Sequence, residues 1–254
     1  MISVCLAAHN GEKYLSEQLD SILSQLGPDD ELIISDDGST DGTISIIEGY
    51  IEKDARVKLV TLVQKPQKGM LNTFKYASAN FENALRYARG NYIFLSDQDD
   101  VWHPDKLDIM LSNLNTNILV RSNSLLVTSD CVPIRLSYEE GSSPMHKGLL
   151  ANIKAMKFSG SHMAFRREIL DYALPFPKNL VSHDNWLGCI ALCMGTCHYE
   201  SRPLLYYRMH GQNVSKYNNN PLLLKISYRV VFAAHLLMRI IKLKFFYGKK
   251  VNCR

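Results

Sequence analysis

An apolar run joins directly to three carboxylates at residues 92–100, Tyr92-Ile93-Phe94-Leu95-Ser96-Asp97-Gln98-Asp99-Asp100. The apolar part predicts a buried strand over residues 92–96. Carboxylates this close together repel one another unless a cation neutralises them. Oxygen ligands at a strand end suit Mg²⁺ or Mn²⁺, which take further ligands from a substrate diphosphate. An acidic loop capping a helix that begins near Pro104 is the competing interpretation, and this stretch alone does not decide between the two.

Working outward, the first hundred residues alternate strand and helix patterns. Strands are expected at residues 2–8, 31–35, 57–63 and 92–96, with helices from about 12 to 25, from 41 to about 53, and ending near 90. This alternation predicts an α/β fold with a mostly parallel, doubly wound, Rossmann-like sheet flanked by helices. Later strands are expected at 125–129, 162–165 and 204–208, and later helices at 185–194 and from Pro221 to about Tyr247.

Polar clusters follow three of these strands directly. They are His9-Asn10-Gly11, Asp36-Asp37-Gly38-Ser39 and Asp97-Gln98-Asp99-Asp100. Ligands of such sheets bind beyond the carboxyl ends of the strands, so the three clusters predict one binding rim. The second cluster has two interpretations, a polar turn before a helix or a carboxylate that accepts from a base or ribose. Neither GxGxxG nor the phosphate-loop pattern is present, which argues against a dinucleotide fold and a P-loop kinase.

Composition is that of an ordinary globular enzyme. The chain has 254 residues, 46% of them hydrophobic, enough for one sizeable domain. Its six cysteines fit no common disulfide or zinc spacing, and its start lacks the pattern of a secretory signal, so a reducing cytoplasm is expected. Charge is unevenly distributed: eleven basic residues and no acidic residue follow Glu200, although the net charge is only +4.

The basic tail predicts an amphipathic helix. On a helical wheel its basic side chains and one histidine share an arc: Lys225, Arg229, His235, Arg239 and Lys242. Charges interrupt every apolar run well short of the ~20 residues of a membrane span. We therefore expect a helix that lies on an anionic membrane surface, with packing against the catalytic domain or a partner subunit as the alternative. No aromatic-interleaved basic patch indicates nucleic-acid binding.

Taken together, the motifs resemble the family 2 glycosyltransferases with the GT-A fold. The matching stretches are residues 8–11, 31–43 and 88–102, His183-Asp184-Asn185-Trp186, and residues 207–215. Ser-Asp-Gln-Asp-Asp-Val-Trp followed later by His-Asp-x-Trp is similar to rhamnosyltransferase-like members that build O-antigen and capsule chains. The resemblance covers residues 1–215, with a nucleotide-binding half at 1–100 and an acceptor half at 101–215. Residues 216–254 form the predicted basic amphipathic tail.

The resemblance implies roles for individual residues. Ala8 and Asn10 would border the nucleotide, and Asp36 or Asp37 would hold the base or ribose. Asp97 and Asp99 would form the family's Asp-x-Asp, with Asp99 as the more direct metal ligand.

On the acceptor side, Asp184 would be the general base, although it also suits a helix N-cap. Arg208 suits the diphosphate through its planar fork, and His210 suits the metal shell. Residues 158–163 would shape the acceptor site, where the bulky His162 departs from the family's small residues.

These expectations describe an inverting, Mn²⁺- or Mg²⁺-dependent transferase. It would move a hexose or deoxyhexose such as rhamnose from a UDP- or dTDP-sugar to a saccharide or a polyprenyl-diphosphate-linked acceptor, at the cytoplasmic face of a bacterial plasma membrane. One alternative is a non-catalytic scaffold of a polysaccharide assembly complex. Another is a nucleotidyltransferase, for which Lys13 alone offers thin support.

Overall fold

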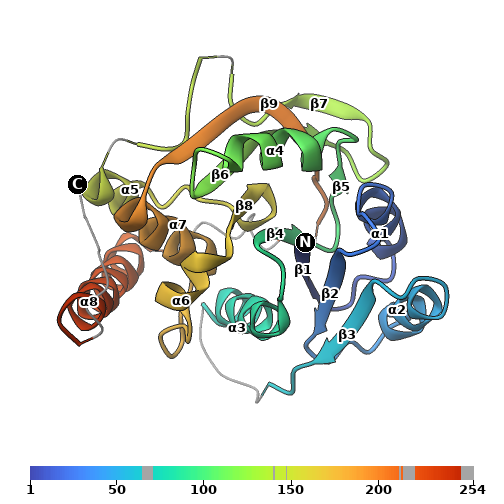
Figure 1. Ribbon diagram of the computed structural model, residues 1–254, viewed down its shortest axis with the longest axis horizontal. Coiled ribbons are helices and arrows are strands. Elements are labelled where there is room, and N and C mark those ends of the chain that lie inside the picture. The colour runs from blue at the N-terminus through green and yellow to red at the C-terminus, as the bar shows by residue number, and fades with distance from the viewer. Residues whose placement is uncertain (65–70, 140, 147, 212, 214–220, 247–254) are drawn as a thin grey trace.

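Four parallel strands form the N-terminal half of the sheet, in the order β3-β2-β1-β4 (Figure 1). They are β1 (Ile2–Ala8), β2 (Glu31–Asp36), β3 (Val57–Thr61) and β4 (Tyr92–Asp97). The computed structural model describes residues 1–64, 71–139, 141–146, 148–211, 213 and 221–246. Almost every residue of β1 and β2 is buried, as expected for strands covered on both faces. The predicted strands of this half are confirmed to within two residues at each end.

The second half of the sheet is mixed. The order continues β4-β8-β6-β9-β5, with β7 pairing β6. These strands are β5 (Val101–Trp102), β6 (Leu119–Val127), β7 (Pro133–Leu136), β8 (Met163–Arg166) and β9 (Cys197–Arg208). Strand β8 runs antiparallel to both β4 and β6, whereas β6 and β9 are parallel. The prediction of a mostly parallel sheet therefore fits the first half of the chain best.

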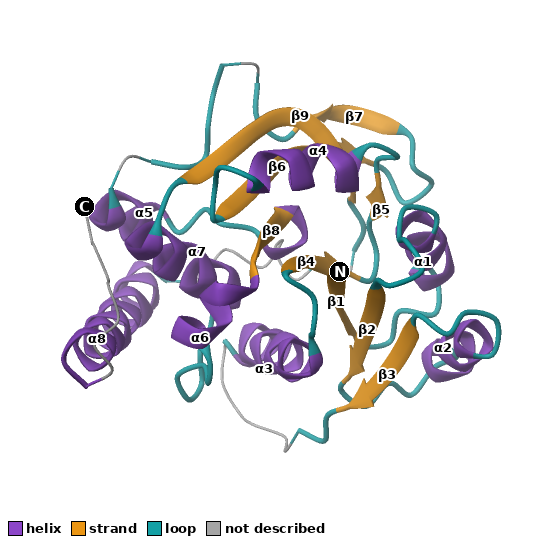
Figure 2. Cartoon of the chain, in the orientation of Figure 1, coloured by secondary structure: helices purple, strands orange, loops and turns teal. Residues whose placement is uncertain are grey.

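Helices cover both faces of the sheet (Figure 2). One face packs against α1 (Leu15–Leu23), α2 (Thr43–Ile51) and α4 (Lys106–Leu114). The other packs against α3 (Asn72–Tyr87), α6 (Leu170–Ala173) and α7 (His183–Met194). Alternate residues of one strand point to opposite cores, as Cys5 and Leu6 of β1 show. The predicted α/β fold, a sheet flanked by helices, is confirmed.

Several short elements lack a clear signature in the sequence. Sequence patterns did not predict β5, β7 or α5 (Leu149–Ala155), and β6 and β9 begin six or more residues before the predicted strands. All four residues of β7 are exposed, so no alternation of buried and exposed side chains marks it. Two short 3₁₀ helices, η1 (Gly160–His162) and η2 (Arg167–Ile169), flank β8.

The predicted tail helix is α8 (Leu222–Phe246), which lies against α5 and α7 at the edge of the molecule (Figure 1). Phe232 and Leu236 are buried, and the Phe232 ring meets the Trp186 ring edge to face at 6.0 Å between centroids. Arg239 donates to the carbonyl oxygens of Tyr172 (2.8 Å) and Leu174 (3.3 Å) and stacks on Trp186. Residues 216–220 and 247–254 of the predicted tail lie outside the described residues.

The orientation of α8 corrects one expectation. The predicted basic arc turns partly toward the body, because Arg239 is bound to backbone carbonyls there. The outward side instead carries apolar residues that are between 43% and 81% exposed: Leu223, Ile226, Val230, Val231, Leu237, Met238 and Ile241. None of the described helices is long and apolar enough to cross a membrane.

Candidate active site

The three predicted polar clusters meet at one edge of the sheet. Strands β2, β1 and β4 are parallel neighbours, so their carboxyl ends, at Asp36, Ala8 and Asp97, lie side by side. Gln98 connects two of the clusters, because its Nε2 donates to the His9 carbonyl (2.9 Å) and its Oε1 accepts from the His9 N–H (2.8 Å). A Cβ on Gly11 would come within 2.4 Å of that amide, which explains the glycine there.

The Asp36 carboxylate accepts hydrogen bonds within its own turn. Its Oδ1 accepts from the N–H groups of Gly38 (2.9 Å) and Ser39 (3.0 Å), and its Oδ2 accepts from the Ser39 hydroxyl. Gly38 has a φ of +93°, which favours glycine at this position. Of the two interpretations of this cluster, Asp36 therefore matches the structural turn.

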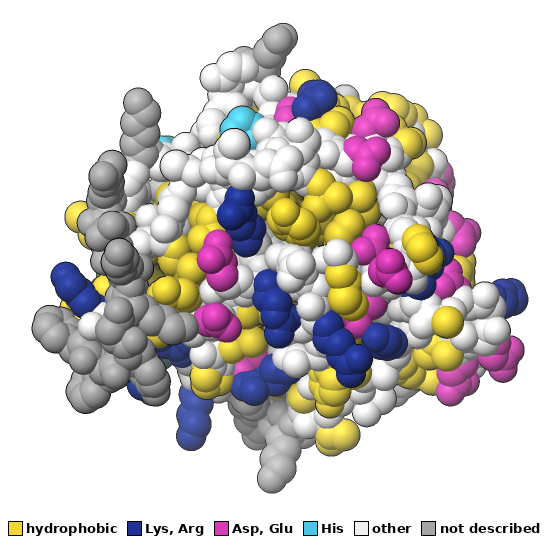
Figure 3. Space-filling model, viewed as in Figure 1, with side chains coloured by type: hydrophobic (Ala, Val, Ile, Leu, Met, Phe, Trp, Pro, Cys, Tyr) yellow, Lys and Arg dark blue, Asp and Glu magenta, His cyan; other side chains and the backbone are white. Residues whose placement is uncertain are grey.

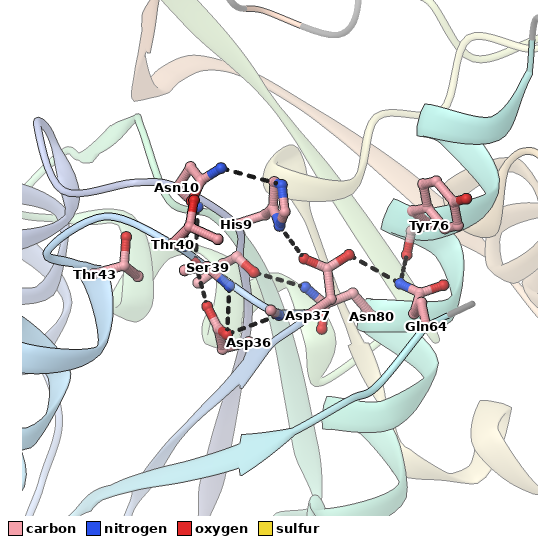
Figure 4. Close-up of polar contacts among 12 residues, drawn as sticks. His9, Asn10, Asp36, Asp37, Ser39, Thr40, Thr43, Gln64, Tyr76 and Asn80 are labelled. Atoms are coloured by element: carbon pink, nitrogen blue, oxygen red, sulfur yellow. Dashed lines mark hydrogen bonds and ion pairs between the residues drawn. The ribbon is translucent and has the colours of Figure 1, made fainter. Parts of the chain in front are cut away.

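Asp37 points away from this turn, toward His9 and Gln64 (Figure 4), and its side chain is only 9% exposed. Its carboxylate lies 2.7 Å from Nδ1 of His9 and accepts from Nε2 of Gln64 at 2.9 Å. Burial raises the pKa of Asp37, and the neighbouring His9 opposes that rise. Of the two aspartates predicted for the base or ribose, only Asp36 accepts hydrogen bonds from its own turn among the described residues. Asp37 is therefore the better candidate to bind a nucleotide.

The first loop is tied to the second. Asn10 has a φ of +50°, its N–H donates to the Ser39 hydroxyl (2.8 Å), and its Oδ1 accepts from the Thr40 N–H (2.8 Å) (Figure 4). The Ala8 side chain is wholly buried in the core, and its carbonyl accepts from Nδ2 of Asn80 (3.0 Å). Any contact of Ala8 with a ligand would therefore go through its backbone, while Asn10 lies exposed at the rim.

At the end of β4 the carboxylates interact mainly with one another. Burial, and next the Asp99 carboxylate, raise the pKa of Asp97 to about 7. Burial, and next the carboxylates of Asp99 and Asp97, raise the pKa of Asp100 well above its usual range. Asp100 is completely buried, and its Oδ2 has no hydrogen-bond partner among the described residues. Burial and the neighbouring carboxylates therefore favour the protonated forms of Asp97 and Asp100, and added positive charge would favour the ionised forms.

One buried lysine opposes these pKa shifts. Lys106 is completely buried, its ammonium donates to the Ser161 carbonyl at 2.7 Å, and burial lowers its pKa to about 7. Ser161 in turn donates from its side chain to Asp97. Sequence patterns did not single out Lys106, because a lysine in the first turn of a helix belongs to no motif and gives no sign that it is buried.

Two predicted metal ligands meet across 111 residues. Nε2 of His210 lies 2.8 Å from Oδ2 of Asp99. The His210 backbone N–H donates to Oδ1 of Asn213 (2.5 Å), and its ring packs on Tyr14 with 5.0 Å between centroids. The described residues contain no group of three acidic, histidine or cysteine side chains poised as a complete metal cage. A carboxylate and an imidazole nevertheless fit Mn²⁺ or Mg²⁺ that takes its remaining ligands from water and a diphosphate.

Arg208, predicted to contact the diphosphate, is bound by several groups within the protein. Its guanidinium contacts the Glu17 carboxylate (2.5 Å), donates to the carbonyls of Asp99 (2.9 Å) and Ser129, and lies over the Tyr14 ring. Its backbone N–H donates to Asp100 at 3.1 Å. Because the side chain is buried and each of its three nitrogens has a partner within the protein, Arg208 holds the Asp99–Asp100 backbone in place, and its predicted contact with a diphosphate stays a prediction.

Asp184 lies in the first turn of α7. Among the described residues, its hydrogen bonds all go to Oδ1, from Ser182 Oγ (2.5 Å), the Asn185 N–H (2.7 Å) and Asn185 Nδ2 (3.2 Å). The helix begins at His183 with Ser182 as N-cap, so the N-cap interpretation of Asp184 is wrong by two residues. Asp184 also contributes to the raised pKa of Asp97, so the two carboxylates are electrostatic neighbours.

The loop before β8 is anchored to the core by the buried side chain of His162. His162 is buried, its Nε2 lies 2.9 Å from the Ser124 hydroxyl, and burial keeps its pKa well below the usual range. Its bulk is accommodated in the interior, so it takes no acceptor-facing position. Three further polar residues of this region were not predicted from the sequence: Arg121, Tyr138 and Tyr199. An arginine within the otherwise uncharged run Leu119–Leu126 is the one signal that would have found this group.

One hollow of about 600 Å³ lies at the start of β4, lined among others by Tyr92, Arg166 and Asp171, at the opposite end of the strand from Asp97. Basic and acidic side chains are interspersed on the face in Figure 3, unlike the one-signed surface of a typical nucleic-acid-binding protein.

Comparison with known proteins finds relatives among glycosyltransferases. An uncharacterized glycosyltransferase of Nostoc is 29% identical over 84% of this chain and 66% of its own length. The Escherichia coli UDP-Glc:alpha-D-GlcNAc-diphosphoundecaprenol beta-1,3-glucosyltransferase is 27% identical over 55% of this chain and 54% of its own. The Shigella flexneri dTDP-rhamnosyl transferase is 35% identical over 40% of this chain and 34% of its own. The chain thus spans less than two thirds of the length of these relatives.

Solved structures show the same fold. Staphylococcus aureus TarS residues 1–349 with UDP-GlcNAc superimposes with a TM-score of 0.62 at 19% identity, over 96% of this chain and 73% of that one. A Pyrobaculum calidifontis mannosyltransferase with GDP-Man and Mn²⁺ gives a TM-score of 0.60 at 18% identity, over 95% of this chain and 64% of that one. Residues 3–173 match the family described as Glycosyl transferase family 2. The chain therefore belongs to glycosyl transferase family 2, with a GT-A-like fold.

Proposed function

We propose that this protein is an inverting glycosyltransferase that uses a nucleoside-diphosphate sugar, UDP- or dTDP-linked, and a divalent cation. The observation that carries the proposal is the convergence of Asp99 with His210, beside Asp97, at the rim that also holds Asp37 and Asp184. Asp99 and His210 would hold Mn²⁺ or Mg²⁺, which neutralises the negative charge of a leaving diphosphate when bound. Asp37 would accept from the nucleotide base or ribose.

Asp184 supplies the base. Its Oδ2, which accepts no hydrogen bond from the described residues, would take the proton of the acceptor hydroxyl. The acceptor oxygen then bonds to the anomeric carbon while the bond to the nucleoside diphosphate breaks on the opposite face, so the configuration inverts. Ser182 and Asn185 fix Oδ1 and thereby orient the carboxylate.

The experiment replaces Asp184 with Asn and compares it with Asp130→Asn, an exposed aspartate far along the chain. We expect Asp184→Asn to lower turnover about 10³-fold while nucleotide binding in the presence of Mn²⁺ persists, because only proton removal is lost. Asp130→Asn should match the wild type. Unchanged turnover in Asp184→Asn would remove this residue from the mechanism, and a wild type without turnover on any donor would favour the scaffold alternative.

The acceptor is proposed to be a saccharide of a bacterial surface polysaccharide, such as O-antigen or capsule, carried on a polyprenyl diphosphate. Support comes from the Escherichia coli and Shigella relatives, whose names specify a lipid-diphosphate acceptor and a rhamnosyl donor. A hexose and a deoxyhexose such as rhamnose are both compatible with the motifs. Pairing each nucleotide sugar with a short lipid-diphosphate acceptor, and measuring released nucleoside diphosphate, identifies the donor.

We further propose that α8 docks on an anionic membrane at the cytoplasmic face, with residues 216–254 as a membrane-associating tail. The exposed apolar stripe of α8 lies beside Lys242 and Lys244, and no acidic residue follows Glu200 in the sequence. An apolar face with basic neighbours is typical of helices that lie in the membrane interface.

Liposome sedimentation tests the docking surface. Val230→Asp with Leu237→Asp should abolish binding to anionic vesicles, because two charges would enter the apolar layer. Ile134→Asp, at an exposed apolar residue of β7, is the matched control and should bind as the wild type does. Equal binding by the double variant refutes the membrane proposal, as does a wild type that instead forms dimers broken by the same pair of substitutions.

A further inference from the structure

Three polar groups that the proposed chemistry does not use lie together beside Asp184. Arg121 on β6 and Tyr199 on β9 are direct partners in the parallel strand pair. The guanidinium carbon of Arg121 lies 5.2 Å from the centre of the Tyr138 ring and 5.9 Å from that of Tyr199. Tyr138 and Tyr199 meet edge to face at 6.3 Å. The arginine is therefore enclosed by two aromatic rings.

The position of Tyr138 is fixed by its backbone. Asn123, two residues along β6 from Arg121, donates from Nδ2 to the Tyr138 carbonyl (2.8 Å) and accepts the Tyr138 N–H at Oδ1 (3.2 Å). These two bonds hold the loop after β7 against the sheet. Strand pairing and these backbone hydrogen bonds therefore fix the relative positions of Arg121, Tyr138 and Tyr199.

Buried donors in this group lack partners. Arg121 is only 2% exposed, yet its Nε and Nη1 have no hydrogen-bond partner among the described residues, nor has the hydroxyl of Tyr199. Tyr138 supplies a side-chain hydrogen bond to the guanidinium, but buried N–H groups without partners are costly, so a site that keeps them is expected to bind an anion. Asp184 is an electrostatic neighbour of Arg121, but its carboxylate hydrogen bonds come from Ser182 and Asn185.

We propose that Arg121, with Tyr138 and Tyr199, forms an acceptor subsite that binds an anionic group, a phosphate or a carboxylate, next to the hydroxyl that Asp184 deprotonates. The planar fork of arginine suits both groups, and the tyrosine rings offer an aromatic surface to an adjoining sugar. The role of the subsite as part of an acceptor site rests on the proposed function. Such a subsite would select acidic or phosphorylated acceptors over neutral ones.

The test is a calorimetric titration of the protein saturated with Mn²⁺ and UDP or dTDP, so that the donor site is occupied. The probes are methyl phosphate, methyl glucuronide and the neutral methyl glucoside. We expect one of the two anions to bind at least tenfold more tightly than the glucoside, and which one binds distinguishes a phosphate from a carboxylate. Arg121→Gln should lose that binding at least tenfold, and Tyr199→Phe about threefold to tenfold.

Controls separate the subsite from folding and from the donor site. Arg135→Gln removes an exposed arginine on β7 and should leave anion binding unchanged. If Arg121→Gln does not fold, Arg121→Lys and Tyr199→Phe carry the test, with weakened binding expected in both. Anion binding that survives in the folded Arg121 and Tyr199 variants, or absence of binding by both anions, overturns the proposal. Failure of the nucleotide to bind refutes the proposed function instead, and the same titration on nucleotide-free protein then decides the subsite by itself.

Discussion

The carboxylates at the end of β2 and those at the end of β4 lie on either side of β1 and are treated differently by the fold. At β2, Asp36 receives three hydrogen bonds from Gly38 and Ser39, so its charge is satisfied locally. At β4, burial and mutual repulsion raise the pKa values of Asp97 and Asp100. Asp36 is therefore part of a structural turn, whereas ionisation of Asp97 and Asp100 is disfavoured unless positive charge is added.

The protein supplies part of that charge itself. Lys106 is buried beneath the β4 cluster and reaches Asp97 through Ser161. Lys106 lowers the pKa values of Asp97 and Asp100 only in part, because both remain raised. The contrast separates an acidic residue that builds its loop from acidic residues whose ionisation a bound cation would favour.

The largest expected effect comes from replacing the cation ligand. Asp99→Asn should lower turnover on the order of 10²- to 10³-fold, because charge stabilisation of the leaving group is lost. It should also abolish the rise in melting temperature that Mn²⁺ gives to the wild type. Asp105→Asn, an exposed aspartate in the same segment, is the matched control. A variant at position 99 that Mn²⁺ still stabilises fully would show that the β4 cluster is a structural loop.

The two aspartates after β2 should separate binding from folding. Asp37→Asn should weaken nucleotide binding roughly tenfold to a hundredfold, the worth of a hydrogen bond to a charged group. Asp36→Asn should lower the free energy of unfolding by about 1 kcal/mol, because one acceptor of its turn is lost. Calorimetry with the nucleotide measures the first and denaturant titration the second. The reverse assignment, with Asp36 controlling affinity, would contradict the contrast drawn here.

Sequence patterns located the strand ends that form the binding rim but not the contacts between side chains there. The ends of β1, β2 and β4 were predictable, because a buried apolar run followed by polar residues marks a strand end facing solvent. His210 and Asp99 were named from motifs, and only the fold brings them within 2.8 Å of each other. The internal contacts of Arg208 could not be predicted, because sequence carries no information on which partners a guanidinium finds in the fold, here Glu17 and two carbonyls.

The acceptor half was harder to predict for a different reason. Its contacts join β6, β9 and the loop after β7, so residues such as Arg121 and Tyr138 become neighbours only through strand pairing. Periodicity reports burial along one element and not partners across elements. Short elements such as β7 and α5 are also too brief to show a period.

The smallest expected effect is a pH dependence of cation binding at β4. The folded pKa of Asp97, about 7, lies above its ordinary value of 3.8, so its contribution to stability is full below about pH 4 and is lost as pH rises through about 7. Mn²⁺ binds the ionised form and restores that stability, so its affinity should rise at most about tenfold from pH 6 to pH 8.

The change in melting temperature caused by Mn²⁺, measured at each pH in the wild type and in Asp97→Asn, assigns this effect to Asp97, because only the variant lacks that carboxylate. Buried histidines such as His162 and His183 titrate with and without the metal alike, so they cancel in the difference. Asp37→Asn, which leaves the β4 cluster intact, should keep the same pH profile. An equal Mn²⁺ effect at both pH values would mean that Asp97 is already ionised in the folded protein, and that Lys106 neutralises it more fully than its hydrogen bond to Ser161 suggests.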